Sequence, residues 1–165
     1  MSDFPYSALM INRQICAFFV LLGVVAVSLA PSALASWATS PSIESTIASS
    51  GSPFGLRLSP DGTRAWVTNY SGNSVSIFDT STYQAIPGSP ISVGNTPWDV
   101  VFSPDGARAW VSNYDVTTSP PGSGTTISVL NANTNPPSVT STVTVGFGPT
   151  GMAMSPSGDR LWVAN

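Results

Sequence analysis

The chain has 165 residues, a formal net charge of −3 and only 8% charged residues, with no histidine and one cysteine. An acidic chain so poor in basic residues offers no positive surface to a phosphate backbone, so nucleic acid is not expected as a partner. The lack of histidine removes the commonest general base and metal ligand, and a single cysteine cannot form an internal disulfide. We therefore expect no metal, no cofactor and no catalytic residues in this chain.

The amino-terminal segment has the pattern of a secretory signal peptide. Arg13 precedes an uncharged apolar run over residues 15–30, and the small residues of Ala33-Leu34-Ala35 follow. This order predicts that residues 1–35 are removed by cleavage before Ser36. The alternative is an uncleaved anchor, but the apolar run is shorter than the roughly 20 residues that a membrane-spanning helix needs. We expect a secreted, periplasmic or cell-surface protein with no stable membrane span after cleavage.

The remaining residues, 36–165, contain three copies of one sequence unit. The copies begin near residues 53, 97 and 149 and share the pattern Ser-Pro-x-Gly-x-Arg-x-Trp-Val-x-Asn. Each unit holds short runs rich in β-branched and aromatic residues, and turn residues bound these runs, as is typical of strands. A period of about 40–50 residues with four strands per unit is typical of a β-propeller blade. The predicted fold class is therefore all-β, with blades of four antiparallel strands.

Residues that recur in every copy are assigned to the scaffold. Ser-Pro-Asp-Gly at 59–62 and 103–106 predicts a hairpin turn, because proline presets φ at the first turn position and glycine accepts a positive φ. The repeated tryptophans are expected between adjacent blades, and the repeated asparagines are expected to bond nearby backbone at strand ends. The residues in this class are Arg64, Arg108, Arg160, Trp66, Trp110, Trp162, Asn69, Asn113 and Asn165.

These units resemble the YVTN-type β-propeller repeat, with Trp-Val-x-Asn standing where that family often has Tyr-Val-x-Asn. The resemblance covers nearly all of residues 43–165. Similar repeats occur in surface-layer proteins, in secreted binding propellers and in lactonase-like enzymes. The resemblance thus implies a binding module that recognises a protein, glycan or small molecule through its loop face. The alternative is a truncated lactonase-like propeller enzyme, a sugar-lactone hydrolase, whose catalytic residues lie in missing blades.

Counting strands predicts an incomplete ring. A leading strand near residues 43–49, two full blades and two strands of a third make eleven strands in this interpretation. Because propellers typically close with about 4–8 blades, we expect about two and a half blades, a fragment of a propeller with roughly 6–8 blades in all.

The candidate site lies at one end of the predicted sheets. The second copy carries an insertion within residues 115–124, which is either part of a site or a tolerated polar loop. Two carboxylates at this end, Asp99 and Asp115, could act as an acid/base pair or as cation ligands. Arg57, the one charge in an inner strand, could face an anion or lie along a blade edge. The candidate ligand-binding residues are Arg57, Trp98, Asp99, Tyr114 and Asp115.

Overall fold

The computed structural model describes residues 19–21, 24–26, 46–49, 51–117 and 124–165. The chain divides into two units, residues 1–44 and residues 45–165. In the first unit, β1 (Phe19–Leu21) pairs antiparallel with β2 (Val24–Ala26). The cleavage site predicted at Ser36 lies outside the described residues and stays a prediction. Among the helices of the described part, none combines the length and the apolar character that crossing a membrane requires.

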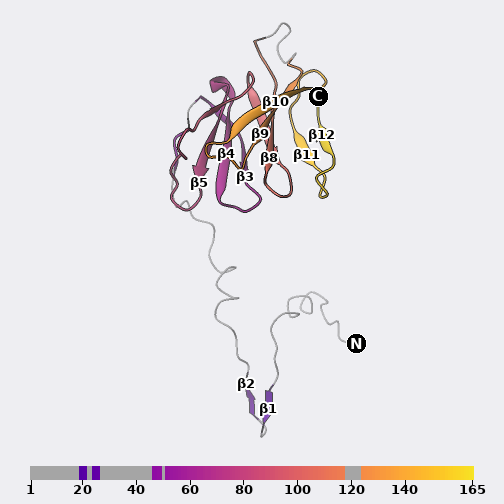
Figure 1. The fold of residues 1–165 in the computed structure, drawn as a ribbon. Coiled ribbons are helices and arrows are strands. Elements are labelled where there is room, and N and C mark those ends of the chain that lie inside the picture. Colours follow the sequence, from indigo (N-terminus) through magenta and orange to yellow (C-terminus); the bar gives the residue numbers. More distant parts are fainter. Residues whose placement is uncertain (1–18, 22–23, 27–45, 50, 118–123) are drawn as a thin grey trace, which may run out of the picture. The chain divides into compact units, whose positions relative to one another are not determined.

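The second unit is built from antiparallel meanders (Figure 1). Blade 1 consists of β3 (Pro53–Leu58), β4 (Arg64–Asn69), β5 (Ser74–Asp79) and β6 (Ile91–Ser92). Blade 2 consists of β7 (Pro97–Phe102), β8 (Arg108–Asn113), β9 (Thr126–Asn131) and β10 (Ser138–Thr144). Blade 3 contributes β11 (Met152–Met154) and β12 (Leu161–Val163). The described residues contain no α-helix, only the 3-10 turn Tyr70–Gly72, so the predicted all-β class is confirmed.

The predicted hairpin turns are present and are closed by side chains. Ser59 O accepts the N–H of Gly62 at 2.8 Å, and Gly62 has the positive φ that glycine tolerates. The carboxylate of Asp61 accepts the Ser59 hydroxyl at 2.6 Å and the Thr63 N–H at 3.0 Å. The same bonds recur in the turn at 103–106. The Ser-Pro-Asp-Gly motif therefore sets the register between the two inner strands of each full blade.

Apolar side chains hold the blades together in two clusters. The first joins blade 1 to blade 2 and has at its centre Trp66, Val75, Ile77, Val100, Ala109, Val111 and Leu130. The second joins blade 2 to blade 3 and has at its centre Val101, Ile127 and Met152. The core of this fold therefore lies between blades, as in a propeller.

The repeated tryptophans lie at these joints. Trp66 is 1% exposed and meets the ring of Phe102 edge-on, with the ring centres 5.2 Å apart. Trp110 packs against the second cluster, which joins blade 2 to blade 3. The predicted position between adjacent blades is confirmed for both. Trp162, the third copy, is 64% exposed.

Three expectations need correction. The predicted leading strand is wrong where it can be examined, because residues 46–49 form no strand. The second unit consequently has ten strands among its described residues, not eleven. The Asn113 side-chain amide donates to the hydroxyls of Thr126 and Ser128 on the next strand of the same blade, not to backbone. The Asn69 amide donates to the equivalent hydroxyls of Ser74 and Ser76.

Candidate ligand-binding site

A β-bulge near the start of β3 and another near the start of β7 shape the candidate site. The pairing register shifts between Pro53 and Leu56 in β3, and between Pro97 and Val100 in β7. A bulge places two residues opposite one and turns a side chain away from its regular direction. The first bulged residue is aromatic in both blades, Phe54 in β3 and Trp98 in β7. The bulges therefore present aromatic rings at the end of the sheets where β4 leads into β5 and β8 leads into β9.

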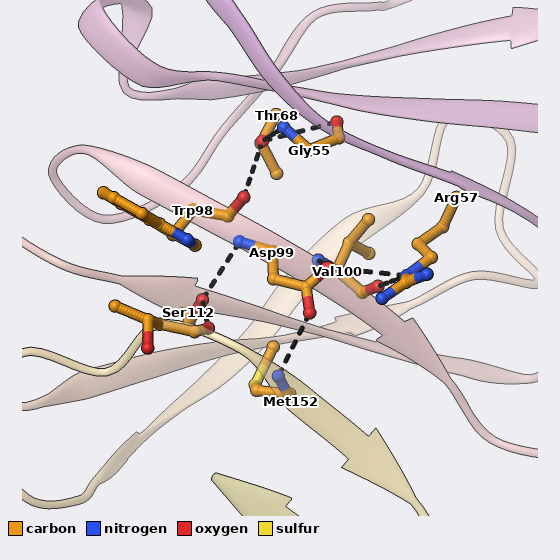
Figure 2. A network of polar contacts seen from close by, with 9 residues as sticks. Gly55, Arg57, Thr68, Trp98, Asp99, Val100, Ser112 and Met152 are labelled. Atoms are coloured by element: carbon orange, nitrogen blue, oxygen red, sulfur yellow. Dashed lines mark hydrogen bonds and ion pairs between the residues drawn. The ribbon is translucent and has the colours of Figure 1, made fainter. Parts of the chain in front are cut away.

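A hydroxyl group locks each bulge and ties its blade to the next (Figure 2). Thr68 Oγ1 accepts the N–H of Gly55 at 2.7 Å and donates to the carbonyl of Trp98 at 3.1 Å. In blade 2, Ser112 Oγ accepts the N–H of Asp99 at 3.1 Å and donates to the carbonyl of Thr150 at 2.7 Å. Sequence reasoning missed Thr68 and Ser112, although a hydroxyl residue precedes the repeated asparagine in the first two copies of the unit.

Asp99 connects all three blades. Its carboxylate accepts the Val100 N–H at 2.9 Å through Oδ1 and the Met152 N–H of blade 3 at 3.0 Å through Oδ2. The guanidinium Nε of Arg57, in blade 1, lies 3.5 Å from Oδ1 (Figure 2). Asp99 is buried, so these partners replace the water that a carboxylate would otherwise hold. This residue positions the bulge of blade 2 against its two neighbours.

Asp115 has different partners from Asp99. Its carboxylate accepts the backbone N–H of Thr117 at 3.0 Å and also the hydroxyl of that residue. This is a local turn at the start of the inserted loop. Residues 118–123 of the insertion lie outside the described part of the chain. Within the described residues, no group of three or more His, Cys, Asp or Glu side chains is placed to hold a metal ion.

Arg57 is anchored at one atom and open at its outer end. Nε donates to the carbonyl of Val100 at 3.3 Å and faces Asp99, while the side chain is about half exposed. Among the described residues, no bond to the two terminal amino groups of the guanidinium is seen. A guanidinium offers five N–H donors, so Arg57 presents donors to solvent beside the bulges.

Four aromatic rings, Tyr70, Phe54, Trp98 and Tyr114, form a continuous row across blades 1 and 2; we call it the aromatic row. The ring centres of Phe54 and Trp98 lie 4.2 Å apart, those of Trp98 and Tyr114 5.0 Å apart, and those of Phe54 and Tyr70 5.8 Å apart. Phe54 is 54% exposed and the other three rings are half-buried. The sequence predicted Trp98 and Tyr114; alignment of the copies would have added Phe54 and Tyr70, which occupy the same repeat positions.

A shallow depression adjoins the row. It has a volume of about 160 Å³ and is lined by Phe54, Trp98, Arg57, Asp99 and the backbone of Gly55 and Gly151. Pockets that enclose small molecules usually measure roughly 300–1,000 Å³. The geometry therefore suits a ligand that lies on the surface along the aromatic row, with Arg57 at its edge.

The carboxylates with perturbed titration lie outside this depression. Hydrogen bonds lower the pKa of Asp61, Asp105 and Asp159 in the hairpin turns, with serine hydroxyls as the largest cause. The pKa of Asp79 is lowered to about 2, first by the Ser81 hydroxyl and then by backbone N–H groups. These groups stabilise turns, and their ionised form is favoured for that reason.

Comparison with known proteins identifies relatives by structure. No protein-family model matches the sequence, and no curated protein matches it. Among solved structures, hydrazine synthase of Kuenenia stuttgartiensis is 27% identical with a TM-score of 0.60, and covers 72% of this chain and 30% of its own. A functionally unknown protein from Desulfotomaculum acetoxidans is 25% identical with a TM-score of 0.57, covering 71% and 38%. A candidate 6-phosphogluconolactonase from Bacteroides fragilis is 19% identical with a TM-score of 0.59, covering 72% and 33%.

These neighbours have propeller-type folds and include lactonase-like proteins. The chain spans about a third of their length, between 30% and 38%. A likeness at 19% identity carries the fold alone, because one fold hosts many chemistries. The conclusion from fold and comparison together is that residues 45–165 are β-propeller blades, two of four strands and one of which two strands are described.

Proposed function

We propose that this chain is part of a secreted or cell-surface propeller of the YVTN-repeat type that binds a glycan through the loop end of its blades. The observation that carries the proposal is the aromatic row. It leaves Phe54 54% exposed at the end of the sheets where β4 leads into β5 and β8 leads into β9. Exposed aromatic groups collected in one place mark binding surfaces more often than single exposed residues do.

The chemistry of the row favours a sugar chain over the other ligand classes that the fold can serve. Aromatic ring faces carry negative charge density and attract the C–H groups on the flat face of a pyranose. The phenol groups of Tyr70 and Tyr114 can donate and accept hydrogen bonds, and Arg57 adds outward N–H donors. A row of rings beside hydrogen-bonding groups matches a ligand that alternates apolar ring faces with hydroxyls.

Calorimetric titration of the full chain tests glycan binding. The probes are cellohexaose, chitohexaose and an oligogalacturonate of similar length, with a proline-rich peptide as the comparison ligand. We expect at least one oligosaccharide to bind, and Phe54→Ala to weaken binding about tenfold because the most exposed stacking face is lost. Tyr83→Ala is the matched control: it removes an exposed aromatic from the β5–β6 connection. Failure of all three sugars, or equal losses in both variants, would rule out the glycan proposal; binding of the peptide alone would identify a protein-binding module.

Export is tested separately from binding. We expect exported material to begin at or next to Ser36, because the small residues Ala33-Leu34-Ala35 form the end of the predicted signal peptide. Amino-terminal sequencing of the protein recovered outside the cytoplasm measures this. An intact Met1 on membrane-bound material would contradict the predicted cleavage.

The lactonase-like neighbours favour one alternative, a sugar-lactone hydrolase. The test is to incubate the full chain with 6-phosphogluconolactone and with glucono-δ-lactone and to follow acid release. Hydrolysis above the buffer rate that Arg57→Ala reduces would support the enzyme and would contradict the expectation that its catalytic residues lie in missing blades. An unchanged rate in Arg57→Ala would place any activity outside the depression beside the aromatic row.

A further inference from the structure

Arg57 carries a charge at a repeat position that is neutral in the other two copies. The equivalent residues are Val101 in β7 and Ala153 in β11. Each of the three pairs with the repeat tryptophan of its own blade, Arg57 with Trp66. The other two blades therefore form without a charge at this position. A departure from the repeat that the fold does not require is a candidate for function.

The position of Arg57 is set by blades 1 and 2, each of which has all four strands. Its pairing with Trp66 places Arg57 on the face of blade 1 that packs on blade 2, and Nε donates to the carbonyl of Val100 at 3.3 Å. The side chain is 53% exposed all the same. Because the bond to Val100 uses Nε, the two terminal amino groups keep their N–H donors for a ligand.

Asp99 does not neutralise Arg57 toward solvent. The Asp99 side chain is only 13% exposed, and its two carboxylate oxygens already accept the N–H groups of Val100 and Met152. The energy between two charges falls as their separation grows. An anion that arrives from solvent and bonds the terminal amino groups therefore gains more from Arg57 than it loses to the buried carboxylate.

The depression beside the aromatic row brings Arg57 next to two aromatic rings. Phe54 and Trp98 line the depression, and Arg57 and Asp99 are the only charged side chains that the described residues contribute to its lining. A pyranose that stacks on these rings directs the substituents at its edge toward the same lining. A guanidinium matches the planar geometry of a carboxylate and bonds it more strongly than it bonds a neutral hydroxyl.

We infer that the glycan is acidic: a uronic acid residue stacks on Phe54 and Trp98, and its ring carboxylate accepts hydrogen bonds from the terminal amino groups of Arg57. This inference rests on the proposed glycan binding and narrows the ligand to sugar chains with carboxylates on their rings. Each bond in it is a hydrogen bond or an ion pair, and no covalent step is involved.

The net charge of the chain opposes an acidic ligand only weakly. The formal net charge is −3, spread over the whole chain, whereas the contact with Arg57 is direct. At physiological ionic strength, charges in solvent that lie more than about 8 Å apart are largely screened. One close contact with a guanidinium therefore outweighs the distant carboxylates.

Calorimetric titration of the full chain with a matched pair of sugars tests the inference. The pair is hexagalacturonate and its methyl ester, which have the same rings and differ in the charge of the carboxyl groups. We expect the acid to bind about tenfold more tightly than the ester, because only the acid forms charge-assisted bonds. Raising the NaCl concentration from about 0.05 M to about 0.5 M should shrink this preference, since salt screens an exposed ion pair.

Arg57→Gln separates the charge from the stacking. We expect it to weaken binding of the acid about tenfold and to leave binding of the ester unchanged, because Phe54 and Trp98 are still present. Arg108→Gln is the matched control: it removes an exposed arginine from the end of β8 that follows the hairpin turn, away from the aromatic row. The control should keep the full preference for the acid.

The outcomes distinguish this inference from the proposal of glycan binding. If acid and ester bind equally and Phe54→Ala weakens both, glycan binding stands and the preference for uronic acids is wrong. A preference that persists in Arg57→Gln, or that Arg108→Gln also removes, would overturn the role of Arg57. If neither of these sugars nor the neutral oligosaccharides bind, the glycan proposal fails, and the inference fails with it.

Discussion

Trp66 and Trp162 occupy the same position of the repeat and have opposite environments. Trp66 is 1% exposed because the inner strand of blade 2 covers it, whereas Trp162 is 64% exposed on the outer face of blade 3. Both sit in nearly the same local sequence, Arg-Ala-Trp-Val or Arg-Leu-Trp-Val. The difference shows that burial in this fold is supplied by the neighbouring blade, so stability resides in the joints.

The largest expected effect comes from the two tryptophans themselves. Trp66→Ala should lower the free energy of unfolding by about 3–5 kcal/mol, because it opens a cavity in the first joint. Trp162→Ala should change it by less than about 0.5 kcal/mol, as for other exposed positions. Urea unfolding at low protein concentration measures both and avoids association. Equal losses would show that blade 3 is covered in solution.

Trp66→Phe is a milder substitution that tests which part of the Trp66 side chain stabilises the first joint. The indole N–H of Trp66 is buried without a hydrogen-bond partner among the described residues. Trp66→Phe keeps an aromatic ring and removes that donor, so it should cost clearly less than Trp66→Ala. A loss as large as that of Trp66→Ala would mean that the N–H is bonded, for example to a buried water.

Substitutions at Asp99 and Arg57 compare the contact of blade 2 with blade 3 and its contact with blade 1. Asp99→Ala leaves the N–H groups of Val100 and Met152 without their acceptor, so the free energy of unfolding should fall by about 1–3 kcal/mol. Arg57→Ala removes only the half-exposed partner and should cost about 0–1 kcal/mol. Equilibrium unfolding of both variants measures the difference. A larger loss in Arg57→Ala would mean that the first joint depends on the ion pair.

The hydroxyls of Thr68 and Ser112, which bond to the next blade, allow a matched comparison with a smaller expected effect. Thr68→Val and Ser112→Ala each leave a bulge N–H and a carbonyl of the next blade unpaired, which should cost about 1 kcal/mol or somewhat more. Ala164→Ser introduces a hydroxyl at the same repeat position in blade 3 and should change stability by less than about 0.5 kcal/mol. If Ala164→Ser stabilises the chain as much as the other two destabilise it, the outer face of blade 3 has an acceptor close by.

The blades and their turns were predictable because the forces that form them are local. Ser-Pro-Asp-Gly carries its own turn chemistry, and the β-rich runs on either side pair across it. The same pattern of β-rich runs and turns occurs in three copies, so each copy supported the assignment of strands in the others. The strand order of both full blades therefore agrees with the prediction.

The candidate site was only partly predictable because backbone irregularities build it. The bulges that turn out Phe54 and Trp98 leave no sequence signature, and the residue before each repeat proline takes a positive φ in all three copies, at Ser52, Thr96 and Gly148. Only glycine suggests this conformation from sequence. Asp99 looked like a free carboxylate because its partner, the Met152 N–H, is backbone of the next blade, 53 residues further along the chain.

The smallest expected effect concerns acid stability and compares Asp79 with Asn131, its equivalent in blade 2. Both side chains accept a backbone N–H two residues further along the chain, but only Asp79 carries a charge. The pKa of Asp79 falls from its ordinary value of 3.8 to about 2 in the folded chain, because Ser81 and two backbone N–H groups favour the ionised form. A lowered folded pKa contributes stability that is complete above the unfolded pKa and is lost as the pH falls toward the folded one.

We therefore expect Asp79→Asn, which copies the residue of blade 2, to flatten the loss of stability between pH 3.8 and about 2. Asp61, Asp105 and Asp159, whose pKa values are also lowered, keep part of the acid dependence in the variant. Because Asp79 is only partly buried, its effect is screened by solvent and should be the smallest of the series. The measurement is the urea midpoint of wild type and variant at a series of pH values. Parallel curves would show that the turn at Asp79 keeps its hydrogen bonds in the unfolded chain, since a group with the same pKa in both states contributes no pH dependence.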